Sequence, residues 1–494
     1  MTGPPITDVR LGPPRLYHES TGDTWDPAWA ADDSLVFVGN DGSGWRKACA
    51  NNVFFNRVRG DDPHDLNGET ICMPEYGGGA EKGPDGATWK SSGCLALDGV
   101  IYCVVARHTY GTHSGDRFRR QTARGASVIK STDGGRTWER PAHENYASPM
   151  FPGGRFATPY FIHYGQDGAA PPVDYADRFI YAISNNGFWC NGDNYILGRV
   201  ARAHLGRLDP GDWRFYRGGD GLADAAWVSD PEQAVLIIDN PLHCGESGAT
   251  YIPALGRYVL VAWSYPGDPN VETDETRLIF YEAPHPWGPW TAVREVASRP
   301  HGWYCPRVLA KWQRAAGSEV DAVLATGGDY YEMDDYYRFT VVPLQLRAGG
   351  HYPPLPPEPM TCTVSHLETG PGPNRVEYRG AWRQDDSRPK TLTGSEHLSG
   401  AEGAALILHF EGRRVRWIAS KENSFGIAAL SLDGGPERRV DLYTYCVEPQ
   451  MQRLVYDSGP LPPGPHTLTL RLTGEKNASS KGYTIAHDHF EIEP

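Results

Sequence analysis

A recurring hairpin pattern constrains this chain more than any other feature of its sequence. A small or Gly/Pro-containing entry leads into an apolar strand, a turn and a second apolar strand, and the pattern starts near residues 27, 92, 157, 247 and 305. Its strands are rich in Val, Ile, Tyr and Phe, as hairpin strands are. The gaps between the starts leave room for two further strands in each repeat. The sequence therefore predicts an all-β chain whose residues 1–345 form a five-bladed β-propeller, with seven blades as the alternative.

The composition favours many short strands joined by tight turns. The 494 residues include 57 Gly, 41 Pro, 15 Trp, 26 Tyr and 15 Phe, a combination of turn formers and aromatic residues typical of such chains. Long stretches with helical periodicity are absent from the sequence, which argues against a barrel of alternating strands and helices. No apolar run reaches the roughly 20 residues that a membrane-spanning helix needs, so we expect no membrane partner.

A second domain is expected after a proline-rich linker. Residues 346–360 contain the segment PPLPPEP, which is typical of a stiff connector. In residues 361–494, short segments alternate between apolar and polar side chains and are separated by turns. This pattern predicts a β-sandwich.

The net charge limits the classes of partner. Lys and Arg number 47 and Asp and Glu number 61, so the net charge is 47 − 61 = −14. Phosphate backbones would be repelled, and we expect no nucleic-acid partner. A neutral sugar or a cation suits an acidic surface better, although a local basic pocket could still hold an acidic sugar. The N-terminal residues resemble no secretion signal, which leaves both the cytoplasm and export of a longer precursor open. The oligomeric state is not indicated.

The cysteines give no metal or redox signature. Nine are scattered along the chain without a CxxC or zinc-type spacing, so most are expected to be buried thiols, with one or two disulfides still possible. Neither an EF-hand nor an HExxH spacing is present, and the sequence predicts no metal ligands and no required cofactor.

The segment from Ser131 to Trp138, STDGGRTW, resembles the Asp-box of sialidases and other carbohydrate-active propellers. Asp133 is expected to cap a turn that the two following glycines permit, with Trp138 packed beneath it. The resemblance implies an outer hairpin, away from any chemistry.

A broader resemblance covers residues 20–345. DTWDPAWAADDSLVFVG, which starts at Asp23, is similar to the first blade of five-bladed arabinanase- and xylosidase-type glycoside hydrolases and related sialidase-like propellers. The segments that start at Phe156 and Cys244 are similar to later blades. The resemblance implies that Asp26 is the general base, Asp167 orients and tunes the pKa of its partner, and Glu246 is the general acid. The usual Glu-Gly-Pro is replaced by Glu246-Ser-Gly. Such propellers also make an axial Ca²⁺ possible.

These assignments predict a glycosidase acting on an oligo- or polysaccharide, because glycoside hydrolysis needs one carboxyl group as acid and another as base or nucleophile. The substrate-binding candidates combine aromatic rings for stacking on sugars with cations for polar groups. They are Trp25, Tyr304, Lys90, Arg107, Arg155 and Arg307. The tail segments that start at Ser431 and Leu461 resemble galactose-binding-like carbohydrate modules.

Two other classes of function remain open. A polysaccharide lyase acting on a uronate-containing linkage, such as rhamnose–glucuronate, would need a His or Tyr base and a group that neutralises the carboxylate. The candidate residues for that chemistry are His108, His163, Tyr164, His301 and Tyr304. A non-catalytic carbohydrate-binding protein is the other class. For the acidic and aromatic stretch at residues 329–337, a rim loop over the pocket and a solvated turn are both open.

Overall fold

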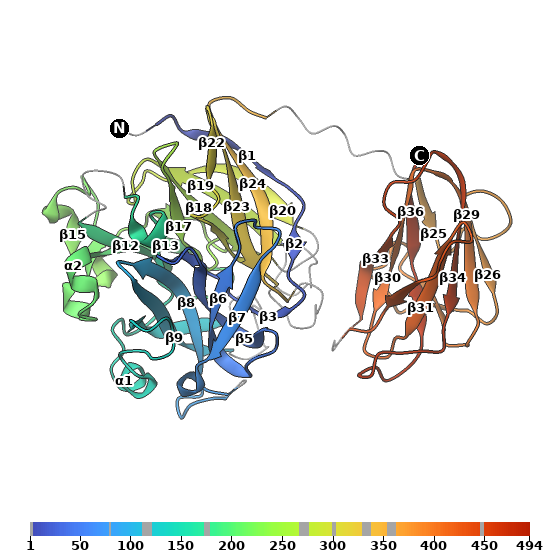
Figure 1. The fold of residues 1–494 in the computed structure, drawn as a ribbon, viewed down its shortest axis with the longest axis horizontal. Coiled ribbons are helices and arrows are strands. Elements are labelled where there is room, and N and C mark those ends of the chain that lie inside the picture. Colours follow the sequence, from blue (N-terminus) through green and yellow to red (C-terminus); the bar gives the residue numbers. More distant parts are fainter. Residues whose placement is uncertain are drawn as a thin grey trace. The chain divides into compact units, whose positions relative to one another are not determined.

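The computed structural model describes residues 3–78, 81–110, 121–171, 178–265, 276–298, 303–328, 337–352, 362–444 and 449–494. They divide into two compact units, of which the first ends at Tyr352 and the second runs from Cys362 to Pro494. Both units consist mainly of strands (Figure 1), which confirms the all-β prediction. In the described ranges, no helix is long and apolar enough to cross a membrane.

The first unit contains five antiparallel sheets within its described residues. The first sheet comprises β3 (Ser20–Asp23), β4 (Ala28–Trp29), β5 (Leu35–Trp45), β6 (Asn51–Arg59) and β7 (Asn67–Cys72). The second comprises β8 (Thr88–Leu97), β9 (Val100–Thr109) and β10 (Thr122–Ser131). The third comprises β11 (Tyr160–Phe161), β12 (Phe179–Asn185), β13 (Asn194–Ala201), β14 (Arg214–Tyr216), β15 (Trp227–Val228) and β16 (Ile238–Asp239).

The remaining two sheets follow in chain order, and the fifth also takes in the N-terminus. The fourth comprises β17 (Ala249–Ile252), β18 (Arg257–Ser264), β19 (Thr276–Ala283) and β20 (Thr291–Ser298). The fifth comprises β21 (Tyr304–Val308), β22 (Arg314–Ala316), β23 (Glu319–Gly327), β24 (Thr340–Ala348), β1 (Ile6–Leu11) and β2 (Arg15–Leu16). Short helices lie between strands: α1 (Ala142–Ala147), α2 (Arg202–Leu205) and the 3₁₀ turns η1 (Pro74–Tyr76), η2 (Gln166–Gly168), η3 (Pro210–Asp212), η4 (Asp224–Ala226) and η5 (Pro231–Gln233).

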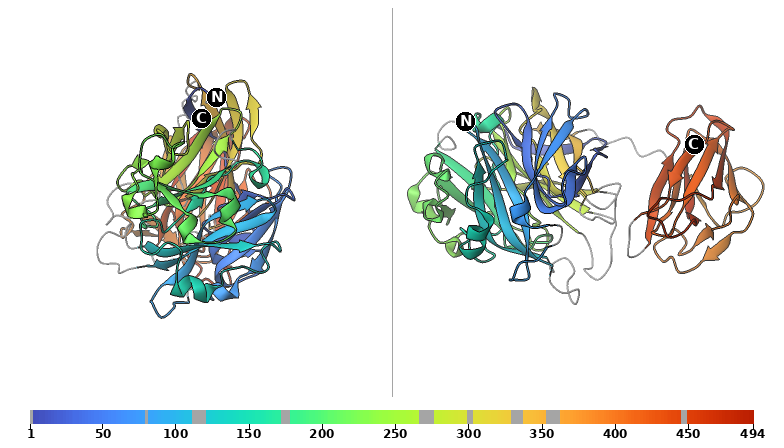
Figure 2. Two further views of the ribbon diagram at one scale, coloured as in Figure 1. Left: turned by 90° about the vertical axis from the view of Figure 1, so that its left-hand side faces the viewer. Right: turned by 60° about the horizontal axis from the view of Figure 1, so that its bottom comes forward.

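The five sheets contact one another in a closed ring. Strand β8 of the second sheet contacts β5 of the first and β11 of the third, and β21 of the fifth sheet contacts β17 and β18 of the fourth. His163 bridges to Thr250 between the third and fourth sheets. Phe339 stacks on Phe37, with ring centroids 5.4 Å apart, between the fifth and first sheets. Figure 2 shows these sheets from two further sides. A ring of antiparallel sheets is the arrangement of a β-propeller.

The N-terminal strand closes the ring. Strand β1 pairs with β24 at the outer edge of the fifth sheet, with Val9 opposite Leu346. The five repeat starts expected at 27, 92, 157, 247 and 305 lie in or next to β4, β8, β11, β17 and β21. Strands β8, β11, β17 and β21 are edge strands, and the opposite edges of their sheets are formed by β10, β15, β20 and β1. In the first sheet β4 pairs with β5, next to the edge strand β3. The repeat pattern therefore marks the strands nearest the centre of the ring.

The end of the first unit differs from the boundary expected at residue 345. Strand β24 continues to Ala348, and the buried ring of Tyr352 lies 4.6 Å from the guanidinium carbon of Arg10 and 4.4 Å from that of Arg347. Two cation–π contacts and a backbone hydrogen bond to Asp8 hold Tyr352 on the first unit. The PPLPPEP segment lies outside the described residues.

One disulfide joins Cys49 and Cys72 in the first sheet. Cys94, Cys103, Cys190, Cys244 and Cys305 are buried thiols and Cys362 is an exposed one, while Cys446 lies outside the described residues. The sequence prediction of mostly buried thiols with one or two disulfides agrees with these residues.

The second unit is a β-sandwich around one apolar core. One sheet comprises β25 (Cys362–Ser365), β36 (His489–Glu493), β30 (Arg414–Lys421) and β33 (Gln450–Asp457). The facing sheet comprises β26 (Arg375–Arg379), β29 (Ala405–Gly412), β34 (Gly464–Leu472), β31 (Ile427–Leu432) and β32 (Arg438–Asp441). A smaller sheet comprises β27 (Arg383–Asp385), β28 (Glu396–Ser399) and β35 (Ile485–His487). Trp417 and Phe490 from one sheet and Leu408 and Leu470 from the other are fully buried in the shared core.

Candidate functional site

Glu246 lies at the centre of the ring, in the segment that enters β17. Its backbone nitrogen donates to the Trp189 carbonyl at 3.3 Å, and its own carbonyl accepts from Trp263 Nε1 at 2.9 Å. The side chain is fully buried. Oε1 accepts a hydrogen bond from Cys305 Sγ at 2.9 Å, whereas Oε2 is buried and has no hydrogen-bond partner among the described residues. One carboxyl oxygen is thus held, and the other is available.

Burial raises the pKa of Glu246 well above its ordinary value. Asp23 raises this pKa further by charge repulsion, while the hydrogen bond from Cys305 and the positive charge of Lys90 lower it. The net direction is upward, so Glu246 keeps its proton at pH values where an exposed glutamate has lost it. A protonated carboxyl group is the form that a general acid needs.

Lys90, on β8, provides the positive charge near Glu246. Its side chain is buried, and its Nζ forms an ion pair with Asp41 Oδ2. Burial lowers the pKa of Lys90 to about 8, against the opposing attraction of Asp23 and Glu246. Lys90 therefore lies close to three acidic side chains that come from two different sheets.

The first sheet contributes two carboxylates near Lys90, those of Asp23 and Asp41. Asp23 ends β3, is buried, and accepts from Thr24 Oγ1 at 2.7 Å and from Tyr337 Oη at 3.2 Å. Asp41 lies on β5 with φ +51°, and 27% of its side chain is exposed. Tyr110 Oη donates to Asp41 Oδ2 at 3.0 Å. Asp41 is thus the more accessible of the two carboxylates. We call Asp23, Asp41, Lys90 and Glu246 the carboxyl–lysine group.

A second ion pair lies on the same axis and ties the sheets together. Arg307 Nε, from β21, donates to Asp26 Oδ1 at 2.5 Å, and Cys94 N, from β8, donates to Asp26 Oδ2 at 2.8 Å. Arg307 Nη1 donates to the carbonyls of Phe161 at 3.0 Å and Ala249 at 2.8 Å. These partners come from all five sheets. Both carboxylate oxygens of Asp26 are engaged, so this pair has the character of a structural cross-link.

Gly248 explains why the sequence reads Glu-Ser-Gly at this point. A Cβ on residue 248 would lie 2.3 Å from Arg307 Nη2 and 2.6 Å from the Tyr160 Cβ. Only a residue without a side chain lets the chain pass so close to the guanidinium group. The glycine at position 248, where the Glu-Gly-Pro motif has proline, therefore leaves room for the guanidinium group of Arg307.

The residues on the axis do not fit the Ca²⁺ ion that the family resemblance allowed. Calcium needs six to eight oxygen ligands, but the carboxylate of Asp26 is already paired with Arg307, whose fixed positive charge would repel a cation. Among the residues that the structure describes, no group of three His, Cys, Asp or Glu side chains is arranged to hold a metal ion. Arg307 supplies a positive charge at this level of the axis.

Two of the predicted histidines are buried in the first unit. His163 Nε2 lies 2.7 Å from the Cys94 carbonyl, and burial lowers the pKa of His163 to about 4. His108 Nε2 lies 3.1 Å from Gln121 Oε1, and its ring centroid is 4.9 Å from that of Trp189. His163 thus lies close to Asp26 and Arg307. His301 lies outside the described residues, as does the stretch 329–336 of the candidate rim loop.

The predicted aromatic residues have different environments. Trp25 is fully buried among Phe37, Phe54 and Phe339 and donates from Nε1 to the Gly22 carbonyl, so its faces are covered by protein. Tyr304 packs on Trp263 at a centroid distance of 4.6 Å. Its pKa is raised by burial and by the nearby charges of Asp23 and Glu246, among other groups.

Two further candidates, Tyr164 and Asp167, contact residues outside the carboxyl–lysine group. Tyr164 packs against Tyr258 in a neighbouring apolar cluster. Asp167, with φ +50°, accepts from Gly99 N at 2.9 Å with Oδ2. Gly99 lies in the β8–β9 turn, at the opposite end of β8 from Lys90. Burial raises the pKa of Asp167, but its partners are turn residues.

The side chains of the two remaining arginines form hydrogen bonds with other residues of the protein. Arg107 forms two hydrogen bonds with Asp85, at 3.1 and 2.8 Å, and lies 4.3 Å from the Trp89 ring. Arg155 donates to the Ala234 carbonyl at 3.1 Å. The structure therefore brings Glu246 and Lys90 together near Tyr304, brings Asp26, Arg307 and His163 together, and places the other candidates elsewhere.

Asp23 and Asp41 are the site residues that sequence reasoning missed. Asp23 stands three residues before Asp26 in the same segment, and Asp41 follows the apolar residues of β5 after Gly39 and Asn40. The available signal was Asp41, an acidic residue in the same strand as an apolar run, since a carboxylate in such a place costs free energy unless it has partners.

The segment from Ser131 to Trp138 forms the expected turn. Asp133 Oδ1 accepts from Ser131 Oγ at 2.8 Å and from the backbone nitrogens of Arg136 and Thr137, both at 3.0 Å. The Thr137 hydroxyl donates to Oδ2 at 2.6 Å, and this hydrogen bond, together with the others, lowers the pKa of Asp133. Trp138 packs edge-on against Phe55, with centroids 5.6 Å apart. The turn follows β10, the outer strand of the second sheet.

Comparison with known proteins gives only distant likenesses. No protein-family model and no curated protein sequence matches the chain. Solved structures that resemble it include a proposed hydrolase from Bacteroides ovatus, with 11% identity over 67% of this chain and 87% of that one and a TM-score of 0.42. Xylan β-1,4-xylosidase from Bacillus halodurans has 11% identity over 97% of both chains and a TM-score of 0.34. Exo-β-1,3-galactanase from Phanerochaete chrysosporium has 9% identity over 83% of this chain and 97% of that one, with a TM-score of 0.25.

Proposed function

We propose that the five sheets are the five blades of a catalytic propeller and that the chain hydrolyses a glycosidic bond at its centre. The observation that carries this proposal is Glu246, a fully buried carboxyl group with a raised pKa and one oxygen without a described partner, near Asp23 and near a lysine that is paired with Asp41. Glycoside hydrolysis uses this pairing of a protonated acid with a second carboxylate.

The carboxyl–lysine group divides the roles in this proposal. Glu246 protonates the leaving oxygen from Oε2. Asp23 raises the pKa of Glu246 and so keeps the proton in place. Asp41, the more exposed carboxylate, activates water or attacks the anomeric carbon, and Lys90 holds it in position through their ion pair. Asp26 keeps Arg307 in place, because both of its oxygens are already bonded.

The substrate class follows from the charge of the site. Three carboxyl side chains surround one lysine, which disfavours a polyanion and suits a neutral oligo- or polysaccharide. We infer a neutral sugar at the bond that is cleaved.

A panel of plant and microbial polysaccharides tests this function. Reducing ends and the ultraviolet absorbance of an unsaturated uronate are followed together, with the native chain. Reducing ends without that absorbance support hydrolysis. An unsaturated uronate product would show that the chain is a lyase, and binding without any product would show that it is a non-catalytic sugar-binding protein.

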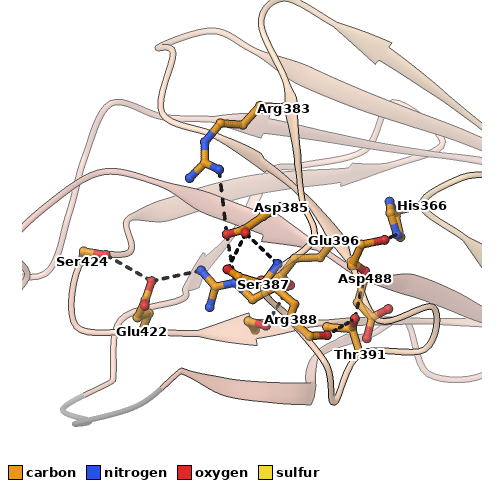
Figure 3. A network of polar contacts seen from close by, with 12 residues as sticks. His366, Arg383, Asp385, Ser387, Arg388, Thr391, Glu396, Glu422, Ser424 and Asp488 are labelled. Atoms are coloured by element: carbon orange, nitrogen blue, oxygen red, sulfur yellow. Dashed lines mark hydrogen bonds and ion pairs between the residues drawn. The ribbon is translucent and has the colours of Figure 1, made fainter.

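We propose that the second unit binds carbohydrate through a buried arginine. Arg388 Nε lies 3.2 Å from Asp385 Oδ2 and 3.2 Å from Glu396 Oε1, and Nη2 lies 3.6 Å from Glu422 Oε2 (Figure 3). Its Nη1 is buried with no hydrogen-bond partner among the described residues. Burial raises the pKa of Glu396 to about 7. A fixed guanidinium with neighbouring carboxylates suits the paired hydroxyls of a neutral sugar.

Retardation of the full chain in polysaccharide-containing native gels tests this second proposal. Arg388→Gln should remove the retardation, while Arg383→Gln, which changes an arginine with a side chain 68% exposed, should keep it. Equal retardation of the native chain and Arg388→Gln would contradict the assignment, provided that circular dichroism shows both to be folded.

A further inference from the structure

Cys305 occupies an unusual backbone conformation beside Glu246. It lies on β21 with φ +47°, and its side chain is buried. The register between β21 and β23 shifts between Tyr304 and Arg307, so the strand is irregular at this residue. A left-handed conformation in a residue other than glycine costs free energy, and such residues cluster at functional sites.

The thiol of Cys305 is the hydrogen-bond donor to Glu246. Sγ lies 2.9 Å from Oε1. Burial raises the pKa of Cys305 well above its ordinary value, so the sulfur keeps its hydrogen. A thiol that stays protonated next to a carboxyl oxygen donates to it. Oε1 is therefore the acceptor oxygen of the carboxyl group.

This contact has a consequence for the proton of Glu246. A neutral carboxyl group carries its hydrogen on one oxygen, and the oxygen that accepts from a neighbouring donor is the carbonyl oxygen. With Oε1 occupied by the Cys305 hydrogen, the acidic hydrogen belongs on Oε2. That oxygen has no hydrogen-bond partner among the described residues.

We propose that Cys305 is a positioning residue, whose S–H group holds Oε1 of Glu246 and so keeps the transferable proton on Oε2. The proposal rests on the function proposed above for Glu246. Cys305 itself gives and takes no proton in the reaction.

Two substitutions separate the hydrogen bond from the volume of the side chain. Cys305→Ala removes the donor, whereas Cys305→Ser keeps one. Cys103→Ala removes a thiol of equal burial from β9 and is the matched control. Because the Cys305 hydrogen bond lowers the pKa of Glu246, its loss should move the deprotonation of Glu246 to higher pH.

Infrared difference spectra of the full chain without substrate measure this directly. The carbonyl stretch of protonated Glu246 is identified by its absence in Glu246→Gln. In Cys305→Ala this band should move to higher frequency and persist to higher pH, while Cys305→Ser and Cys103→Ala should keep it near its native place. With a cleaved substrate, the alkaline limb of the kcat profile should move in the same direction, and kcat should fall about tenfold in Cys305→Ala.

Each outcome decides one of the two proposals. An unchanged Glu246 band in Cys305→Ala would overturn the positioning role, and so would a Cys305→Ser band that follows that of Cys305→Ala. A shifted band in a chain that cleaves no polysaccharide would confirm the positioning contact and refute the hydrolytic function. Circular dichroism of each variant establishes that it is folded.

Discussion

Two polar groups on the axis of the first unit are built from the same kinds of residue and differ in how fully they are paired. The Asp26–Arg307 pair uses both carboxylate oxygens of Asp26, and its partners come from all five sheets. The carboxyl–lysine group leaves Glu246 Oε2 without a described partner and shifts the pKa values of Glu246 and Lys90. Arg307 Nη2 is buried without a hydrogen-bond partner among the described residues, so the contrast lies in the two carboxyl groups: Asp26 is bonded through both oxygens and Glu246 through one. Removing one partner of a buried ion pair is costly to the fold, whereas a buried acid with an unbonded oxygen can transfer a proton.

The Asp26–Arg307 pair should therefore contribute mainly to stability and the carboxyl–lysine group mainly to activity, so mutations at the two groups should give opposite results. Buried charged groups are costly to the fold wherever they occur. Asp26 and Arg307 offset that cost through bonds to five sheets. Glu246 avoids it by keeping its proton.

The largest effect is expected for Glu246→Gln on activity. Glutamine keeps the shape of the side chain and the acceptor for Cys305 but has no acidic proton. The rate of glycosidic cleavage should fall by about 10²–10⁴-fold, measured as reducing ends from the substrate found in the panel. Glu282→Gln, at a buried glutamate that lies 3.4 Å from Arg257, is the matched control and should keep the native rate. A native rate in Glu246→Gln would show that Glu246 is not the general acid and that the two groups do not differ in function.

The next largest effect is expected for Arg307→Met on stability. The change leaves the carboxylate of Asp26 buried without its cation, and breaking a buried ion pair costs about 3–5 kcal/mol of unfolding free energy. Urea unfolding followed by near-ultraviolet circular dichroism measures this loss. The double change Asp26→Leu with Arg307→Met should recover part of it, since no charge is then left unpaired. A stability equal to that of the native chain would mean that the pair does not hold the ring together.

A smaller effect should appear as a pH dependence that comes from Lys90. Its pKa of about 8 in the folded chain lies below the ordinary value of 10.5, so between these values the unfolded chain binds more protons than the folded one. The contribution of Lys90 to stability therefore rises with pH from about 8 to 10.5. Thermal unfolding across this range should show that rise in the native chain relative to Lys90→Met. Parallel curves would show that the lysine is not perturbed.

The smallest effect is expected for Asp133→Ala in the Asp-box turn, which lies outside both groups. Loss of its hydrogen bonds should lower stability by about 1 kcal/mol and leave the cleavage rate unchanged. Thermal unfolding and the reducing-end assay measure the two quantities. A large loss of activity would mean that this outer turn has a part in the site.

Much of the fold is predictable from local sequence pattern. Apolar hairpins that start near 27, 92, 157, 247 and 305 mark the strands at the centre of the ring, and the alternation after residue 361 marks the sandwich. The turn around Asp133 is also local, because its hydrogen bonds join residues at most four positions apart. Side-chain alternation and turn chemistry act over a few residues, so they can be read along the chain.

The site is less predictable, because its contacts join distant segments. Glu246 and Lys90 are candidates that the sequence suggests and that the structure places close to each other, but nothing local shows that Asp26 has an arginine partner 281 residues away. Trp25 is expected on a sugar platform and is instead covered by three phenylalanines from separate strands. Asp23 gives little local signal, and its importance appears only next to Glu246.

By itself, the sequence determined that this chain is built from β-hairpins, that two β units follow one another, and which acidic residues begin the blades. Only the tertiary structure decided which acid is paired and which is available. The reason is physical: the pKa and hydrogen-bonding state of a carboxyl group depend on burial and on charges within a few ångströms, and in a ring of sheets those neighbours come from strands far apart in the chain.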